Sequence, residues 1–136
     1  MTPRAQVIRR YLDYLDACTR HAWNELPQFL AETVLVNGQE RTQTEYVADL
    51  MATIDVFPDY SWDLRHALVD GQWLAVHLTA GGTRAGDFLW ASGDGSRVQT
   101  DEFDMYRIVD GLIHEVLGTA DNARLCSAEL PGRRPG

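Results

Sequence analysis

Glycine turns divide the second half of the chain into short segments, and this spacing constrains the fold more than any other feature. Asp-Gly occurs at 70–71 and 110–111, Gly-Gly at 81–82 and Gly-Asp-Gly at 93–95. Between these turns we place strands at residues 60–69, 72–80, 84–91, 97–109 and 112–120. Connections this short join antiparallel neighbours. The second half therefore predicts an antiparallel meander.

The first part of the chain has helical periodicity instead. Thr2 and Pro3 have the form of an N-cap followed by a first helical position. Apolar residues then recur at helical spacing from Val7 to Cys18, which predicts a long amphipathic helix. Asn24 is placed to cap a short second helix with Pro27 in its first turn.

A third helix follows a short strand. The β-branched run at 33–36 ends at Asn37-Gly38, which is a turn signal. Residues 42–45, Thr-Gln-Thr-Glu, form a capping box that opens a helix, and Pro58 ends it. Helices that precede a meander predict an α+β fold, with the helices covering one face of a curved sheet.

Size and charge narrow the class of protein. A chain of 136 residues suits one domain, which we place at 1–129, with a disordered tail at 130–136. The formal net charge of −8 argues against nucleic acid as a partner. The sequence has no signal peptide pattern and no apolar run long enough for a membrane span. Cys18 and Cys126 are expected to be free thiols in a reducing cytoplasm.

The segment 97–109 carries the most informative side chains. Its even positions include Glu102, Asp104 and Tyr106, and its odd positions include Phe103 and Met105. If the even face points inward, two carboxyl groups about 7 Å apart enter the interior. Each then disfavours ionisation of the other, which suits acid–base chemistry. If the odd face is buried, both carboxylates are solvated, and alternation alone leaves both interpretations open.

Two further features have both a functional and a structural interpretation. In 60–69 the even positions form the apolar face, so His66 is expected on the buried side, either as a hydrogen-bonded core residue or as a pocket residue. Gly118 lies within the last strand, where glycine either leaves room at a pocket wall or marks a bulge.

The aromatic residues suit a flat apolar ligand as well as ordinary core or dimer packing. The four tryptophans are Trp23, Trp62, Trp73 and Trp90. The sequence lacks dinucleotide, P-loop and metal-ligand spacings, and its serines are in no nucleophile-elbow context. Any chemistry is therefore expected to be proton transfer without a metal or organic cofactor.

Several segments together resemble the SnoaL-like polyketide cyclases and the related ester cyclases, over nearly the whole chain. These segments are 36–38, 57–59 (Phe-Pro-Asp), 82–89 and 106–113 (Tyr-Arg-Ile-Val-Asp-Gly-Leu-Ile), the last leading to Asp121. The resemblance implies the cone-shaped fold of ketosteroid isomerase, a homodimer, a buried cavity and no cofactor. It also implies that the even face of 97–109 points inward.

This sequence also differs from the family at positions that carry its catalytic and pocket residues. The aldol cyclases of this family carry their catalytic aspartate on the last strand, where this sequence has Gly118. Their pocket histidine corresponds to Asp104 and a glutamine to Glu102, and ester cyclases commonly have histidine at the position of Arg84. The catalytic carboxylate has therefore moved to the neighbouring strand, the reaction is different, or activity has been lost.

Three functions follow as hypotheses. The first is a cofactor-independent cyclase or isomerase of polyketide-like secondary metabolism, such as antibiotic biosynthesis, with Asp104 and Glu102 as acid and base. The second is a hydrolase or dehydratase in the same pocket, and the third is a non-catalytic domain that binds a ligand or a partner. The ligand is expected to be a small hydrophobic or aromatic molecule. The residues expected to contact it are Asn37, Tyr46, Trp62, His66, Arg84, Trp90, Tyr106, Gly118 and Asp121.

Overall fold

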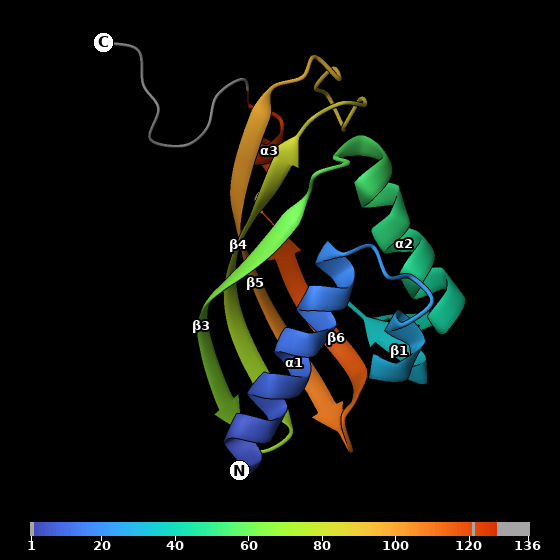
Figure 1. The fold of residues 1–136 in the computed structure, drawn as a ribbon, viewed down its shortest axis with the longest axis vertical. Coiled ribbons are helices and arrows are strands. Elements are labelled where there is room, and N and C mark those ends of the chain that lie inside the picture. The colour runs from blue at the N-terminus through green and yellow to red at the C-terminus, as the bar shows by residue number, and fades with distance from the viewer. Residues whose placement is uncertain (1, 121, 128–136) are drawn as a thin grey trace.

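The computed structural model describes residues 2–120 and 122–127. The first helix, α1, spans Pro3–Thr19 and begins as expected, because the Thr2 hydroxyl accepts a hydrogen bond from the backbone N–H of Ala5 at 3.1 Å. Its buried face consists of Tyr11, Tyr14, Leu15, Ala17 and Cys18. This face packs against the concave side of the sheet (Figure 1).

A short connection leads from α1 to the edge of the sheet. It contains the 3₁₀ helix η1 (Leu26–Phe29), whose N-cap position is Glu25 and not Asn24 as expected, and the Glu25 side chain forms no capping hydrogen bond. Strand β1 (Leu30–Val36) follows and turns at Asn37-Gly38, both of which have positive φ, into β2 (Gln39–Thr42), a strand that the sequence did not predict. The capping box at Thr42 then opens α2 (Gln43–Val56), as expected.

Within the described residues, six strands form one mixed sheet in the order β2-β1-β6-β5-β4-β3. Strands β3 (Ser61–Asp70), β4 (Trp73–Thr83), β5 (Arg97–Val109) and β6 (Leu112–Ala120) form the predicted antiparallel meander. Strand β1 joins this meander in parallel beside β6. The chain also forms a short helix, α3 (Asn122–Leu125), and the predicted tail at 130–136 lies outside the described residues.

Two of the expected boundaries within the meander are wrong. Residues 84–91 form no strand, and only an isolated bridge joins Phe88 to Ala91. The Gly81-Gly82 pair is not a turn, because β4 continues through it to Thr83. A Cβ atom at Gly81 would collide with the backbone of Val98, and one at Gly82 would collide with Asp59 and Tyr60. These glycines permit close packing of backbones within the sheet, which a sequence pattern does not distinguish from a turn.

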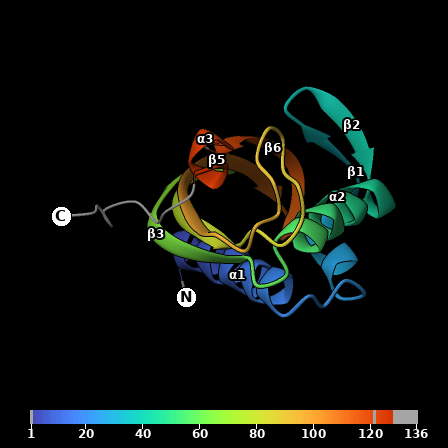
Figure 2. The same cartoon turned by 90° about the horizontal axis from the view of Figure 1, so that it is seen from above.

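Seen from above, the strands curl into a ring, with α1 and α2 lying along it (Figure 2). The larger core cluster fills the space between α1, α2 and the lower part of the sheet. A smaller cluster around Phe57, Tyr60 and Val98 closes the other end. The predicted α+β fold, with a curved mixed sheet and helices on its concave face, is confirmed. None of the described helices is long and apolar enough to cross a membrane.

Candidate active site

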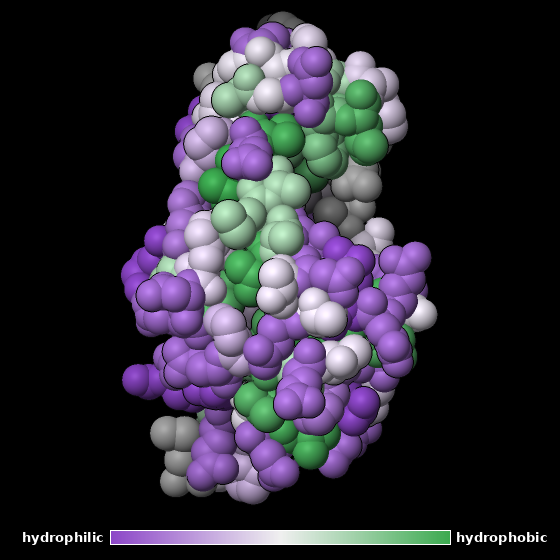
Figure 3. Space-filling view, turned by 90° about the vertical axis from the view of Figure 1, so that its right-hand side faces the viewer, coloured by the Kyte–Doolittle hydropathy of each residue, from purple (hydrophilic) through white to green (hydrophobic). Residues whose placement is uncertain are grey.

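A cavity of about 390 Å³ lies between α1, α2 and the concave face of the sheet. Strands β1, β5 and β6 supply its floor, and the two helices supply its walls. The surface on the α2 side of the molecule is mostly hydrophilic, with apolar patches between the polar side chains (Figure 3). The lining residues are Tyr14, Leu15, Cys18, Val36, Asn37, Tyr46, Asp49, Leu50, Thr53, Trp62, Glu102, Asp104, Tyr106 and Val116.

Strand β5 turns its even-numbered side chains into the cavity. Asp104 and Tyr106 are buried and Glu102 is half-buried, whereas Phe103 and Met105 are exposed on the opposite face. The two open interpretations of this strand are thereby decided in favour of the inward-facing carboxyl groups. Two acidic side chains consequently share one face of one strand, two residues apart, inside an apolar cavity.

Gly118 explains how the Asp104 carboxyl group fits against the floor. The two residues lie directly opposite each other in the β5–β6 register. A Cβ atom at position 118 would overlap the carboxyl group of Asp104. Asp104 therefore occupies the space beside the last strand that a side chain at position 118 would need. Glycine at this position is a requirement of the site, and not a bulge, since β5 and β6 stay in register from Glu102 to Arg107.

The two carboxyl groups influence each other's ionisation. Burial raises the pKa of Glu102 from its ordinary 4.5 to about 9, and a hydrogen bond to Asp104 and repulsion by its charge add to this effect. Burial also raises the pKa of Asp104, although hydrogen bonds from Glu102 and Tyr106 oppose the rise. Glu102 is therefore the member of the pair that keeps its proton in neutral solution, hydrogen bonds assist ionisation of Asp104, and the two groups titrate as one unit.

Tyrosine hydroxyls surround this pair. The Tyr106 hydroxyl donates to Asp104 Oδ2 at 3.5 Å, and the hydroxyls of Tyr14 and Tyr46 are 2.7 Å apart. Burial raises the pKa of all three tyrosines, so each remains a neutral hydrogen-bond donor at physiological pH. The arrangement combines two carboxyl groups, of which Glu102 is the protonated one, and neutral donors in one cavity.

Asn37 connects the cavity floor to the edge of the sheet. Its side chain donates to the carbonyl of Gly118 at 3.2 Å and accepts from the N–H of Gly118 at 2.9 Å. The left-handed backbone conformation of Asn37 and the parallel pairing of β1 with β6 bring these groups together. Asn37 therefore holds the segment of β6 that faces Asp104.

The structure brings together six of the residues predicted from the sequence. Asn37, Tyr46, Trp62, Glu102, Asp104 and Tyr106 all line the cavity. Gly118 lies behind Asp104 in the floor. Of the four tryptophans, only Trp62 is among the described lining residues. Asp121 lies outside the described residues.

Three of the predicted residues lie away from the cavity. His66 is exposed, because a register shift between Leu64 and His66 reverses the faces of β3; its expected burial is wrong. Its ring stacks on His77 on the outer side of the sheet. Trp90 is 73% exposed in the 84–96 connection, so it forms no part of the aromatic wall.

Arg84 is buried but has a structural role. Its guanidinium group donates to the carbonyl oxygens of Ser92, Leu125 and Ser127, at 2.7 to 2.9 Å, and pairs with Asp94. These bonds fix the irregular connection against the C-terminal segment, at the end of the molecule that the smaller core cluster fills. Its expected contact with a ligand is therefore not supported by its position.

Several lining residues on the two helices were not predicted from the sequence. Tyr14 follows Tyr11 by three residues and precedes Cys18 by four, so helical spacing places it on the buried face. Asp49 and Thr53 continue the face of α2 that begins with Tyr46. These residues were detectable only as a helical face, because nothing in the sequence shows which faces surround a cavity.

Glu102 is expected to make the stability of the protein depend on pH. The unfolded chain loses this proton near its ordinary pKa of 4.5, whereas the folded chain keeps it to about 9. Stability should therefore fall as the pH rises between these values. Glu102→Gln removes the effect, so we expect it to stabilise the protein at about pH 7 by on the order of 3 kcal/mol.

Urea unfolding of the wild type and Glu102→Gln from about pH 5 to about pH 9 measures this difference. Glu40→Gln, which changes an exposed glutamate on β2, is the matched control and should behave as the wild type. A stability difference between wild type and Glu102→Gln that does not vary with pH would contradict the assignment.

Among the residues that the structure describes, no group of three or more His, Cys, Asp or Glu side chains is arranged to hold a metal ion. The described thiols of Cys18 and Cys126 are free, as expected. Burial raises the pKa of the Cys18 thiol to about 12, so it lines the cavity as a neutral group.

Comparisons with known proteins agree with this architecture. The model of the SnoaL-like polyketide cyclase family matches residues 5–128. The crystal structure of a SnoaL-like polyketide cyclase from Agrobacterium tumefaciens is 26% identical, with a TM-score of 0.81, over 87% of this chain and 93% of that one. A comparison with curated proteins finds no significant match.

Two structures from Streptomyces share the fold at lower identity. IdmH, a putative polyketide cyclase from Streptomyces antibioticus, is 19% identical with a TM-score of 0.79, over 88% of this chain and 95% of that one. AclR, a putative hydroxylase from Streptomyces galilaeus, is 18% identical with a TM-score of 0.77, over 90% of this chain and 93% of that one. Since the family match covers nearly all of the sequence and the fold agrees, the chain belongs to the SnoaL-like polyketide cyclase family.

Proposed function

We propose that the protein is a cofactor-independent cyclase or isomerase of polyketide-like molecules, and that Asp104 and Glu102 transfer the protons. The observation that supports this most strongly is the pair of inward-facing carboxyl groups in the 390 Å³ cavity. Two carboxyl groups side by side, one of which gives up its proton more readily than the other, supply the base and the acid that proton abstraction and return require.

The proposed cycle leaves the enzyme with the same number of protons. The Asp104 carboxylate removes a proton from a carbon next to a carbonyl group, and an enolate forms. In a cyclisation the enolate carbon attacks a second carbonyl carbon, a carbon–carbon bond forms, and Glu102 gives its proton to the resulting alkoxide. The proton on Asp104 then returns to Glu102 through the hydrogen bond between them. In an isomerisation the proton is delivered to another carbon instead.

In this proposal, neutral tyrosines orient the base and stabilise the oxygen atom on which negative charge develops. The Tyr106 hydroxyl orients the Asp104 carboxylate through its hydrogen bond at 3.5 Å. The Tyr14 and Tyr46 hydroxyls, 2.7 Å apart, form a donor pair from the two helices that line the cavity. Donors fixed before the reaction stabilise a developing enolate or alkoxide oxygen better than mobile water does.

Exchange of carbon-bound hydrogen with solvent tests the proposal without knowledge of the natural substrate. Aromatic ketones and β-keto esters that fit the cavity are incubated in heavy water and followed by NMR. We expect deuterium to enter the carbon next to the carbonyl faster with the wild type than with the Asp104→Asn/Glu102→Gln double variant, by two or more orders of magnitude.

Two results would speak against this function. Equal exchange with the wild type and the double variant would remove the carboxyl pair from the chemistry. Products that incorporate labelled oxygen from water would identify a hydrolase instead, because cyclisation and isomerisation take up no oxygen atom from solvent.

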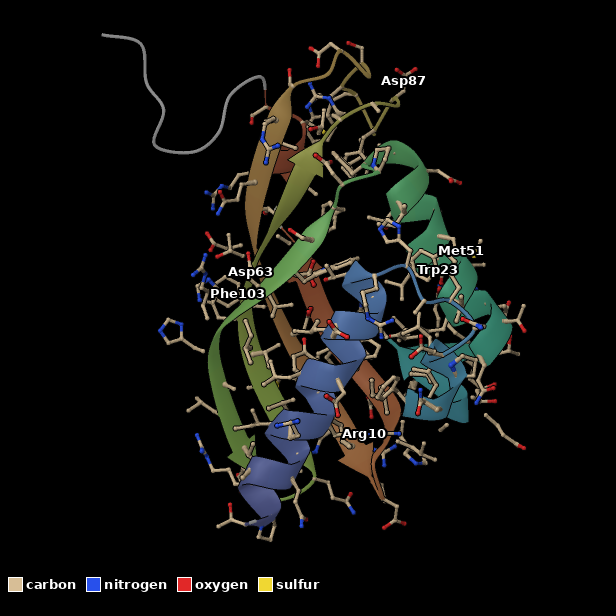
Figure 4. The ribbon with its side chains drawn as sticks, viewed as in Figure 1. Arg10, Trp23, Met51, Asp63, Asp87 and Phe103 are labelled. Atoms are coloured by element: carbon tan, nitrogen blue, oxygen red, sulfur yellow. The ribbon has the colours of Figure 1, made fainter. Side chains whose placement is uncertain are left out.

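We also propose that two copies associate through the outer face of the sheet. Leu68, Phe103, Met105 and Leu117 are exposed there, with Phe103 58% and Leu68 72% accessible. Met105 and Leu117 are direct neighbours in the β5–β6 register. Phe103 lies on the side of the sheet away from α2 (Figure 4). An apolar group of this kind on a small protein marks an interaction surface.

The double variant Phe103→Glu/Leu117→Glu is expected to convert a dimer into a monomer, because it places like charges against an apolar face. Size-exclusion chromatography with light scattering gives the mass of each form. Leu89→Glu, which alters a leucine 62% exposed on the 84–96 connection, is the control and should remain dimeric. A monomeric wild type, or a double variant that stays dimeric, would refute this interface.

A further inference from the structure

The cavity has an unbalanced charge. Three of its lining side chains are acidic, namely Asp49 on α2 and the Glu102–Asp104 pair on β5. Among the described residues that line it, none is Arg, Lys or His. A buried negative charge without a counter-ion is costly, and the complementary ligand for it is a cation.

Three arginines on elements beside the cavity already have partners. Arg10 donates to the carbonyls of Gly111 and Gln28 and lies over the ring of Phe29. Arg107 pairs with Glu115. Arg41 forms two hydrogen bonds with Asp49, at 2.8 and 3.0 Å, which reduces the charge at that wall but leaves the floor unaffected. The Asp104 carboxyl group therefore has no cationic partner among the described residues that line the cavity.

Aromatic rings line the same space. Tyr14 comes from α1, Tyr46 from α2, Trp62 from β3 and Tyr106 from β5. Aromatic side chains around a carboxylate are the usual receptor for an ammonium group, because the ring faces carry negative potential. The apolar lining residues, among them Leu15, Leu50 and Val116, provide room for a hydrocarbon body.

We propose that the ligand of this cavity is an apolar, aromatic-sized molecule that carries one basic nitrogen, and that its protonated form binds against Asp104 and Glu102. The inference rests on the proposed function in placing substrate in this cavity, and it adds the charge of that substrate. A carboxylate or phosphate of the same size is excluded, because no lining side chain among those described neutralises it.

The ionisation of the carboxyl pair supplies a second readout. A bound cation favours the charged form of nearby carboxyl groups, so it lowers the pKa of Glu102 from about 9. Binding of the protonated amine is then accompanied by release of the Glu102 proton to the buffer from a fraction of the complexes, and the complexes that keep this proton are the ones that enter the proposed cycle. A neutral ligand has no such effect.

Three probes of one shape test the charge preference: 1-naphthylmethylamine, 1-naphthylmethanol and 1-naphthoate. Isothermal titration calorimetry of the full chain at neutral pH gives their affinities. Repetition in buffers of different ionisation enthalpy counts the protons released. We expect the amine to bind at least tenfold more tightly than the alcohol, with proton release, and the naphthoate not to bind at millimolar concentration.

Substitution of the two carboxyl groups tests whether they cause the preference for the amine. In Asp104→Asn/Glu102→Gln the amine should lose its advantage and its proton release, while the alcohol binds as before, which shows that the cavity is intact. Asp55→Asn, which changes an exposed aspartate of α2 outside the cavity lining, is the control and should keep the full preference. The inference would be overturned if the alcohol bound more tightly than the amine, if naphthoate bound measurably, or if the amine failed to bind. It would also be overturned if the preference for the amine survived in the double variant.

The result of the binding test can be distinguished from the result of the hydrogen-exchange test of the proposed function. Amine selectivity without carbon–hydrogen exchange would leave the cation site standing and remove the catalytic role. Exchange without amine selectivity would leave the catalysis standing and remove only the cation site.

Discussion

Asp104→Asn is expected to lower turnover by two or more orders of magnitude while the protein stays folded. The amide cannot accept the substrate proton, and losses of this size are typical when a general base is removed. The fold should persist because asparagine has nearly the same volume and can still accept from the Tyr106 hydroxyl. The rate of deuterium incorporation into an activated ketone measures the loss, and circular dichroism checks the fold.

Asp63→Asn is the matched control for this variant. Asp63 is an exposed aspartate on β3, and Figure 4 shows it apart from α2. It should retain the wild-type rate. If Asp104→Asn exchanged hydrogen at nearly the rate of this control, Asp104 would not be the base, and the proposed cycle would fail at its first step.

Gly118→Ala is expected to lower turnover about 100-fold, although it adds only one methyl group. That methyl would overlap the Asp104 carboxyl group, which must rotate or shift to make room. Displacement of a catalytic group by about 1 Å is enough for a loss of this size. Gly86→Ala is the control, because a Cβ atom there meets its nearest neighbour, Val56, at an ordinary 3.5 Å.

A compensating exchange distinguishes loss of geometry from loss of folding. Gly118→Asp alone should be inactive, because two carboxyl groups would compete for one volume. Gly118→Asp with Asp104→Gly moves the carboxyl group to β6, where the aldol cyclases carry it, and part of the activity should return. Full activity of Gly118→Ala, or a double variant no better than Gly118→Asp, would show that the two positions do not share one catalytic space.

The sequence was sufficient for the features that depend on local patterns. The N-cap at Thr2, the capping box at Thr42 and the turns at Gly71 and Gly111 lie where the residue types predicted them. The four long strands follow from alternation between these turns, except where glycine served packing instead of a turn. The β2 strand was missed because its polar residues show no apolar alternation, and its pairing with β1 decides its structure.

The candidate site was only partly predictable for the same reason. Alternation showed that Glu102, Asp104 and Tyr106 share one face of β5, but it did not show which face is inside. His66 was placed on the wrong side because one register shift in β3 reverses every later side chain. Arg84 and Trp90 lie in a segment that has no regular strand, so no pattern gives their direction.

By itself, the sequence determined the order of helices and strands and the pairing of two acidic residues on one strand face, since both depend on neighbours within a few positions. Only the tertiary structure decided that this face lines a cavity, that Asp104 fills the space left by Gly118, and that Tyr14 and Tyr46 meet above it. These contacts join residues far apart in the chain, such as positions 14 and 46, whose meeting depends on how the sheet curls and where the helices pack.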